Sequence, residues 1–115
     1  MTKIAVIDDE EIVRTSIRNI LLRSGYEVID YVDAAFALAD KCLEDVDVII
    51  TDLAMPTRGE ILIQTVRSRE MEIPIIVLSG YIEGKTQELK AMGAQAVLKK
   101  PFTISEFLQV IESVI

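Results

Sequence analysis

Short runs of apolar and β-branched residues recur along the chain, and a longer stretch with helical periodicity follows each of them. The runs cover residues 3–7, 26–31, 46–51, 73–78 and 95–98. The first, third and fourth are almost entirely apolar, which is typical of parallel strands covered on both faces. Strict alternation of strands and helices predicts an α/β fold with a parallel sheet, helices on both faces and right-handed crossovers.

Helical stretches lie between the predicted strands, and glycines mark where two of them end. In the first stretch the apolar residues fall on one helical face, and the helix stops at Gly25. Further helices are predicted over residues 34–43, 60–69 and 84–92, and Gly93 ends the third of these. Each predicted crossover therefore contains one helix.

The last helix has the clearest start signal in the chain. Thr103 and Glu106 have the spacing of a capping box, and Phe102 and Phe107 have that of a hydrophobic staple. The apolar residues that follow cover more than one stripe of the helix. This pattern predicts either a buried face with an additional contact surface or a helix sunk in its own core, and both interpretations stay open.

Composition narrows the class of protein. The chain has 115 residues, half of them apolar, with five Gly and three Pro, and we expect a single globular domain over residues 1–115. The absence of His and the single Cys42 exclude the common zinc sites, serine-protease triads and an intrachain disulfide framework. We expect Cys42 to be a small buried core residue. The apolar runs are too short for a signal peptide or a membrane span, so a soluble cytoplasmic protein without a membrane partner is expected.

The net charge of −7 is unevenly distributed. Residues 1–80 carry 8 basic and 15 acidic side chains, whereas residues 81–115 carry 4 of each. An acidic surface disfavours direct binding of nucleic acid. The neutral C-terminal third is left as the candidate for a protein contact.

Polar residues stand directly after four of the predicted strands. Asp8 and Asp9 follow the first, Asp52 the third, Ser79 the fourth and Lys100 the fifth. Each alone has a plain structural explanation, such as a helix cap, a turn or a solvated lysine. Ligands of open parallel sheets bind beyond the carboxyl ends of the strands, however, so the joint occurrence favours one common site.

Three neighbouring carboxylates repel one another, so they either hold protons or recruit a cation. Oxygen ligands with room for water and phosphate suit Mg²⁺. With the charge neutralised, one aspartate can attack phosphorus as a nucleophile and form an aspartyl phosphate. Lys100 and Ser79 then fit as the cation and the hydroxyl donor for the transferred phosphoryl group.

These residues belong to motifs that closely resemble those of the receiver domain of two-component response regulators, over essentially the whole chain. The motifs are Val6-Ile7-Asp8-Asp9-Glu10, Asp52-Leu53-Ala54-Met55-Pro56, Leu78-Ser79-Gly80, Gly93-Ala94 and Lys100-Pro101-Phe102. The resemblance implies a chemotaxis-regulator-like, flavodoxin-like fold. In that fold a doubly wound sheet of five parallel strands, in the order 2-1-3-4-5, is flanked by five helices.

The resemblance also implies a metal site and a phosphoryl acceptor. Asp52 would accept the phosphoryl group, and Asp9 and Asp52 would bind Mg²⁺ through their side chains. Ala54 would bind the same ion through its backbone carbonyl, and Asp8 would orient the water molecules of the metal.

The resemblance also implies roles for Ser79 and Lys100 and the kinds of partner that the domain would bind. Ser79 would move toward the phosphoryl group, Lys100 would pair with it, and the Lys100–Pro101 bond is a candidate cis peptide. The phosphodonor would be a sensor histidine kinase or a histidine phosphotransfer protein. Phosphorylation would switch binding of a downstream target or of a second copy through the helix over 84–92, the strand over 95–98 and the last helix. We expect a signalling module and not an enzyme with turnover.

The sequence departs from the family in two places. Only Thr57 and Arg58 separate Pro56 from Gly59, where receivers usually have three residues. Val97 occupies the position of the usual aromatic switch residue, so either Tyr81 takes its part or signalling relies on loop shifts.

Two positions that influence the access of water to the phosphoryl group hold Ala54 and Tyr81. Neither side chain is suited to orient an attacking water molecule. We therefore expect slow self-dephosphorylation.

Two alternatives from other classes remain. The first is a receiver-like scaffold that binds partners without phosphorylation. The second is an aspartate-nucleophile phosphatase of the haloacid dehalogenase type, which the missing aspartate at Ala54 disfavours. A flavin site is disfavoured because acidic residues follow the first predicted strand, where a phosphate loop would be required.

Overall fold

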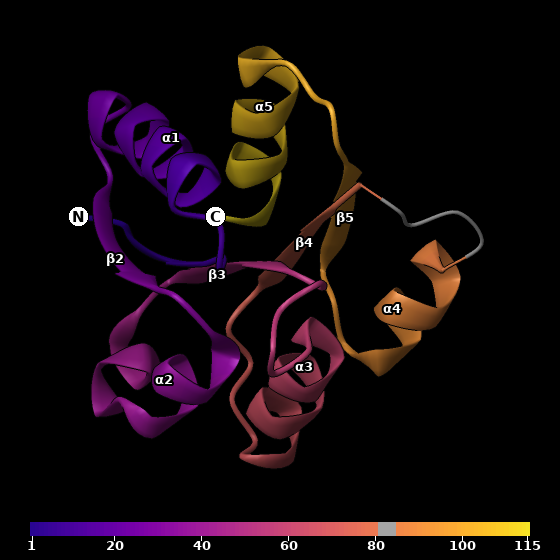
Figure 1. The fold of residues 1–115 in the computed structure, drawn as a ribbon. Helices are drawn as coiled ribbons and strands as arrows, with labels where there is room; N and C mark the ends of the chain where they lie inside the picture. Colours follow the sequence, from indigo (N-terminus) through magenta and orange to yellow (C-terminus); the bar gives the residue numbers. More distant parts are fainter. Residues whose placement is uncertain (81–84) are drawn as a thin grey trace.

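The computed structural model describes residues 1–80 and 85–115, and in this part a parallel five-stranded sheet carries helices on both faces (Figure 1). The strands are β1 (Lys3–Ile7), β2 (Glu27–Tyr31), β3 (Val48–Asp52), β4 (Ile75–Ser79) and β5 (Ala96–Lys99). The helices are α1 (Glu11–Arg23), α2 (Ala34–Ala39), the 3₁₀ helix η1 (Lys41–Asp45), α3 (Gly59–Ser68), α4 (Thr86–Met92) and α5 (Ile104–Val114). The strand order is β2-β1-β3-β4-β5, which confirms the predicted fold.

Two hydrophobic cores lie on opposite faces of the sheet. Helices α1 and α5 cover one face, and α2, α3 and α4 cover the other (Figure 1). Successive residues of β1 alternate between them, since Ile4 and Val6 pack under α1 and α5 whereas Ala5 and Ile7 pack under α2 and α3. Burial on both faces explains why the central strands are apolar at nearly every position.

The predicted strands agree with the structure to within about two residues, but the helix predicted over 34–43 is wrong in its second half. Helix α2 ends at Ala39, and Asp40 adopts an extended conformation. The Asp40 carboxylate accepts a hydrogen bond from the Cys42 backbone N–H at 3.0 Å and caps η1 instead. Short acidic side chains compete with the helix in this way.

This break also makes the prediction for Cys42 wrong. The change from α2 to η1 rotates the chain, so that Leu43 is buried and Cys42 is exposed. The single thiol therefore lies at the surface and contributes nothing to either core.

The start of α5 is as predicted. Thr103 accepts a hydrogen bond from the Glu106 N–H at 3.0 Å, and Glu106 accepts one from the Thr103 N–H at 3.1 Å. The rings of Phe102 and Phe107 stack with their centroids 5.5 Å apart. Phe107 is fully buried, whereas Ile104 is 57% exposed, so α5 combines a buried stripe with outward apolar surface.

No helix within residues 1–80 and 85–115 has the length and apolar character that crossing a membrane requires.

Candidate functional site

The register of the strands brings the predicted site residues to one edge of the sheet. Ile7 on β1 lies beside Thr51 on β3, so Asp8 and Asp52 are neighbours where these strands end. Ser79 on β4 lies beside Lys99 on β5, and the Lys100 backbone N–H donates to the Ser79 carbonyl at 2.8 Å. Residues up to 92 positions apart in the chain therefore converge because parallel strands end on the same edge.

Lys100 connects the two buried carboxylates of the site. Its ammonium nitrogen lies 3.4 Å from Asp52 Oδ2 and 3.6 Å from Asp8 Oδ2. The other oxygen of each carboxylate accepts a backbone hydrogen bond, from Leu53 N–H at 2.7 Å for Asp52 and from Glu10 N–H at 2.9 Å for Asp8. Asp8 is 2% exposed and Asp52 is 6% exposed. Each carboxylate therefore has one oxygen fixed by the backbone and one directed at the same cation.

The acidic side chains form a set that fits a divalent cation. One carboxylate oxygen from each of Asp8, Asp9, Glu10 and Asp52 lies within 4.8 Å of the others. Burial raises the pKa of Asp8 above its usual value, the hydrogen bond from Glu10 and the charge of Lys100 lower it, and the nearby Asp52 carboxylate raises it further. A single ammonium group does not balance this many carboxylates, whereas a hard divalent cation with oxygen ligands would.

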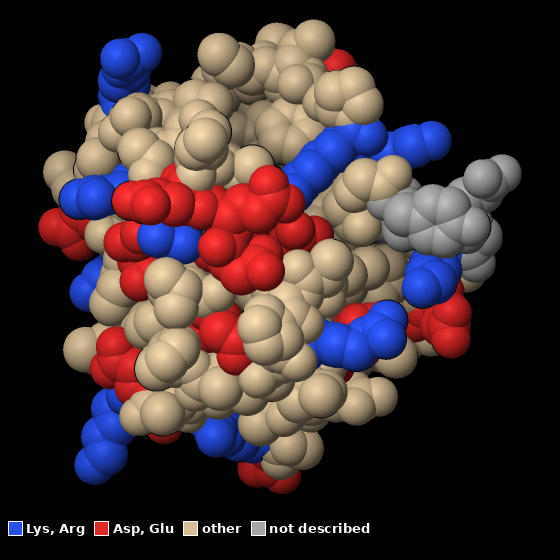
Figure 2. Space-filling model, viewed as in Figure 1, with Lys and Arg blue, Asp and Glu red and all other residues tan. Residues whose placement is uncertain are grey.

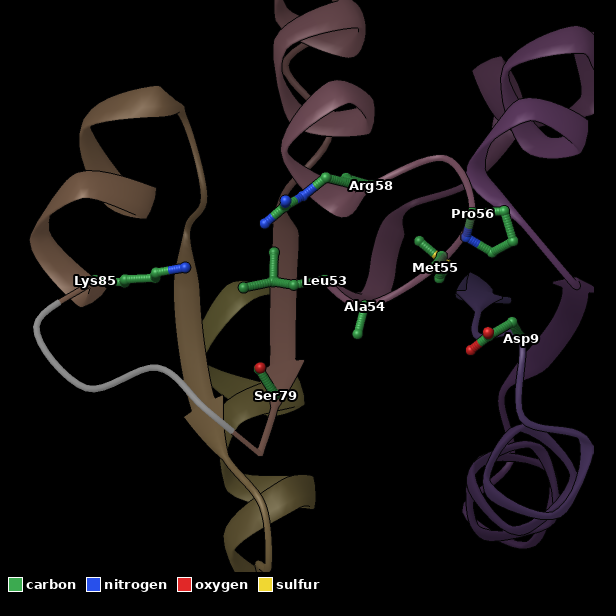
Figure 3. Close-up of a pocket in the computed structure, with 8 residues that line it drawn as sticks. All are labelled: Asp9, Leu53, Ala54, Met55, Pro56, Arg58, Ser79 and Lys85. Carbon is green, nitrogen blue, oxygen red and sulfur yellow. The ribbon is translucent and has the colours of Figure 1, made fainter.

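A pocket of about 730 Å³ opens beside these four acidic residues, which we call the acid cluster (Figure 3). Asp9, Ala54 and Ser79 line it, so three more of the predicted site residues face a common space. Arg58 and Lys85 also line it, and their charged ends point toward each other near Leu53 in Figure 3. Figure 2 shows acidic side chains gathered in the middle of this face, with basic side chains beside them. The lining of the pocket itself combines one acidic side chain, Asp9, with two basic ones, Arg58 and Lys85.

The shortened loop after Asp52 is held at both ends. The Gly59 N–H donates to the Leu53 carbonyl at 3.1 Å, and the Thr57 N–H donates to Asp33 Oδ1 at 2.8 Å. A Cβ atom on Gly59 would overlap the backbone carbonyl oxygen of Asp52, so α3 begins closer to the strand end than any other residue type allows.

Asp33 has a second function in the same place. Its Oδ2 accepts a hydrogen bond from the Ala35 N–H at 3.0 Å and caps α2. Burial alone would raise the pKa of Asp33, but the hydrogen bonds from Thr57 and from the start of α2 outweigh it, and the pKa lies below its usual value. One buried carboxylate thus ties α2 to the loop that carries Ala54.

Arg14 holds the loop between β1 and α1. Its Nη1 donates to the Asp8 carbonyl at 2.8 Å, and its Nε donates to Asp30 Oδ2 at 3.0 Å. The backbone that carries Asp8 and Asp9 is therefore fixed by the side chain of a residue on α1 and, through it, by β2.

The structure brings all six predicted site residues to one end of the sheet, namely Asp8, Asp9, Asp52, Ala54, Ser79 and Lys100. The Lys100–Pro101 bond is cis. Val97 lies in β5 and packs against the core under α2, α3 and α4. The expectations for Tyr81 lie outside the described residues.

Sequence reasoning missed several residues near the site. No sequence pattern marked four charged residues, because each lies in a loop or on a helix that carries other charges. They are Arg14, Asp33, Arg58 and Lys85. Only Gly59 had a usable signal, since it follows the loop that is one residue short. The roles of the charged residues depend on contacts between distant segments.

Comparison with protein families gives one match over nearly the whole chain. Residues 4–112 match the family model described as the response regulator receiver domain. A curated relative, the transcriptional regulatory protein PrrA of Mycobacterium tuberculosis, is 32% identical over 109 residues, which cover 92% of this chain and 46% of PrrA. The chain thus spans about half the length of such relatives.

Solved structures show the same fold. The chemotaxis protein CheY4 of Vibrio cholerae superposes with a TM-score of 0.90 at 32% identity, covering 100% of this chain and 99% of that one. The response regulator TrrA of Thermotoga maritima, solved in complex with Mg(2+)-BeF, superposes with a TM-score of 0.90 at 24% identity and covers 100% of both chains.

Proposed function

The chain belongs to the family of response regulator receiver domains of two-component systems, and from this premise we propose that Asp52 accepts a phosphoryl group in a Mg²⁺-dependent reaction. One observation carries the proposal: a buried carboxylate at the end of β3 lies next to Asp8 and shares the Lys100 ammonium group with it. We propose that residues 1–115 act together as this receiver domain.

The residues of the site divide the work of phosphoryl transfer. Asp52 Oδ2, the oxygen that faces the Lys100 ammonium group, attacks phosphorus while the bond between phosphorus and the leaving group of the donor breaks, and Asp52 Oδ1 stays fixed by the Leu53 N–H. Lys100 moves its pairing from the two carboxylates to the incoming phosphoryl oxygens, where its charge is needed as the transition state forms. Ser79, which lines the pocket, donates a hydrogen bond to the same group.

The donor set fits Mg²⁺. Asp9 and Asp52 would bind the ion with their carboxylates and Ala54 with its backbone carbonyl, and Asp8 would hold its water molecules. When bound, the ion neutralises the acid cluster and the charge of the phosphoryl oxygens.

The partners follow from the family. Receiver domains interact with sensor histidine kinases and with downstream effectors, and we propose that a sensor kinase or a histidine phosphotransfer protein phosphorylates this domain. We propose that phosphorylation changes binding through α4, β5 and α5, where the exposed Ile104 offers apolar surface. We place this signalling module in the cytoplasm, because a single exposed thiol suits a reducing compartment. It has no turnover of an external substrate and no direct contact with nucleic acid.

The phosphorylated state is expected to be long-lived. Ala54 is exposed beside the pocket and has no polar group to orient an attacking water molecule. The rate of phosphate loss can be followed by intact mass. Rapid loss that becomes slower in the Tyr81→Ala variant would contradict this expectation.

Intact mass after incubation with acetyl phosphate and Mg²⁺ tests the assignment of Asp52. The wild type should gain one phosphoryl group, and Asp52→Asn should gain none. Asp45→Asn, which neutralises an exposed carboxylate away from the site, is the matched control and should behave as the wild type. A gain in Asp52→Asn refutes the assignment. No gain in any variant favours a scaffold that works without phosphorylation.

A further inference from the structure

The pocket beside the acid cluster is larger than a phosphoryl group and a metal ion require. Its volume of about 730 Å³ lies within the range of about 300–1,000 Å³ that is typical of small-molecule sites. Leu53, Met55 and Pro56 give it apolar walls. The pocket adjoins the acid cluster through Asp9, so a phosphodonor bound with its phosphorus at Asp52 would have room for its leaving group in this neighbouring space.

Two cations face the part of the pocket that lies away from Asp9. Arg58 precedes α3 and Lys85 precedes α4, and in Figure 3 their charged ends point toward each other beside Leu53. Neither is part of the group formed by Asp8, Asp52 and Lys100. They are thus placed to act on a part of the donor other than the phosphoryl group.

The charges of these cations are available to a ligand. The Arg58 guanidinium lies 3.4 Å from Oε2 of the partly buried Glu60, and because the Arg58 side chain is 64% exposed, solvent screens the pair and it stabilises little. Lys85 forms no ion pair within residues 1–80 and 85–115. A negative charge that enters the pocket would therefore not have to displace a strong existing partner.

We propose that Arg58 and Lys85 bind the leaving group of a small phosphodonor and make this domain selective for acyl phosphates. This inference rests on the proposed function of Asp52. An Asp52 oxygen forms a bond to phosphorus, and the bond between phosphorus and the acyl oxygen breaks. That oxygen keeps the electron pair and departs as a carboxylate, whose negative charge grows in the transition state next to the two cations.

A phosphoramidate provides the contrasting donor. Its bond between phosphorus and nitrogen breaks with the electron pair on nitrogen, and the protonated amino group departs as neutral ammonia. No negative charge develops on this leaving group, so Arg58 and Lys85 have little to stabilise. The ratio of the two phosphorylation rates therefore isolates the leaving group from the rest of the reaction.

Phosphorylation rates with acetyl phosphate and with phosphoramidate, both with saturating Mg²⁺, test the proposal by intact-mass time courses. In the double variant Arg58→Gln/Lys85→Gln the rate with acetyl phosphate should fall about tenfold, and the rate with phosphoramidate less than about twofold. Each single variant should lie between the double variant and the wild type. Equal rate losses with both donors, or no loss with either, would overturn the proposal.

Two controls separate this effect from net charge and from phosphoryl binding. Arg18→Gln and Lys90→Gln remove exposed cations away from the pocket and should leave the ratio of rates unchanged. Beryllofluoride, which mimics the phosphoryl group and has no leaving group, should bind the double variant as tightly as the wild type in a thermal-shift titration. A change of ratio in the controls, or weaker beryllofluoride binding, counts against the proposal. A wild type that gains no mass from either donor would overturn the proposed function and this inference with it.

Discussion

Lys100 and Asp8 show how single charges are balanced at the site. Asp8 is buried, burial raises its pKa, and its nearest cation is shared with Asp52. A buried carboxylate that is only partly compensated lowers the stability of the folded state. The acid cluster is therefore expected to carry a cost in folding stability that a bound cation relieves.

The Asp8→Asn variant tests this cost. Without metal at neutral pH, it should raise the Tm by about 4 °C, which corresponds to roughly 1 kcal/mol for a domain of this size. The amide oxygen can still accept the hydrogen bond from Glu10, so the gain comes from removal of the charge. Differential scanning calorimetry in EDTA measures it, and an unchanged or lower Tm would contradict it.

With Mg²⁺ present, the wild type should have a higher Tm than the Asp8→Asn variant, which is the reverse of the order in EDTA. A ligand that binds only the folded state stabilises it in proportion to the logarithm of its concentration over Kd. Millimolar Mg²⁺ should therefore raise the Tm of the wild type by several degrees and that of Asp8→Asn by less. An equal rise of the Tm in the two proteins would mean that Asp8 does not contribute to the metal site.

At the scale of elements, contacts with other segments position the loop from Ala54 to Arg58. Hydrogen bonds anchor this loop to Leu53 through the Gly59 N–H and to Asp33, the cap of α2, through the Thr57 N–H. Asp33 both caps α2 and accepts from the loop, so one side chain sets the position of two elements.

Replacement of Asp33 by Ala should cost about 2 kcal/mol of unfolding free energy at pH 7, because it removes a helix cap and a buried loop contact. Urea unfolding measures the loss, and Asp45→Ala is the exposed control. The pKa of Asp33 is lower in the folded than in the unfolded protein. Its contribution is therefore complete above the unfolded pKa of about 3.9 and is lost as the pH falls below that value. A difference between wild type and variant that persists undiminished at pH 2 would contradict this account.

Gly59→Ala tests the close approach of α3 to the acceptor strand. The new methyl group would overlap the Asp52 carbonyl oxygen and come within 3.0 Å of Leu53 Cα, so backbone must move. We expect a loss of about 2–3 kcal/mol in urea unfolding, as for other overpacked sites. Gly80→Ala, where a Cβ has no neighbour within 4 Å, should change stability by less than about 0.5 kcal/mol.

On the scale of the whole molecule, Lys100 links the site to the C-terminal elements. It directly follows β5, its N–H bonds to the end of β4, and α5 begins four residues later behind the Thr103 cap. A shift of the Lys100 side chain from Asp8 and Asp52 to a phosphoryl group would therefore act on β5 and on the start of α5.

Hydrogen exchange with mass spectrometry should detect this coupling. Addition of Mg²⁺ and beryllofluoride should change amide exchange several-fold in the peptides that cover β5 and the first turn of α5. The middle of α1, which packs in the core without contact to Lys100, should exchange as before. Changes confined to the loop after Asp52 would mean that the site does not control the C-terminal surface.

The prediction from sequence succeeded for the strands, and the acidic, hydroxyl and lysine residues at their ends lie together at one edge of the sheet as expected. The roles of these residues stay predictions. The buried strands β1, β3 and β4 leave a repeated apolar signal, and a cap such as Thr103 with Glu106 is a contact between close neighbours in the chain. The prediction was wrong at Asp40, whose side chain caps η1 instead of continuing the helix, so that Cys42 is exposed. The outcome depends on whether a longer α2 or a separate η1 packs better against the rest of the protein. The periodicity of the apolar residues is almost the same for both.

Local pattern thus established the alternation of strands and helices and which chemical groups end each strand, because burial of a segment leaves a periodic trace in its own residues. Packing of distant segments established the rest. The register of β1 with β3 makes Asp8 and Asp52 neighbours, the link from Asp33 to Thr57 positions the short loop, and Arg58 and Lys85 meet at one pocket. Each of these arrangements brings together residues that are far apart in the chain, and it forms only when the sheet and its two cores are in place.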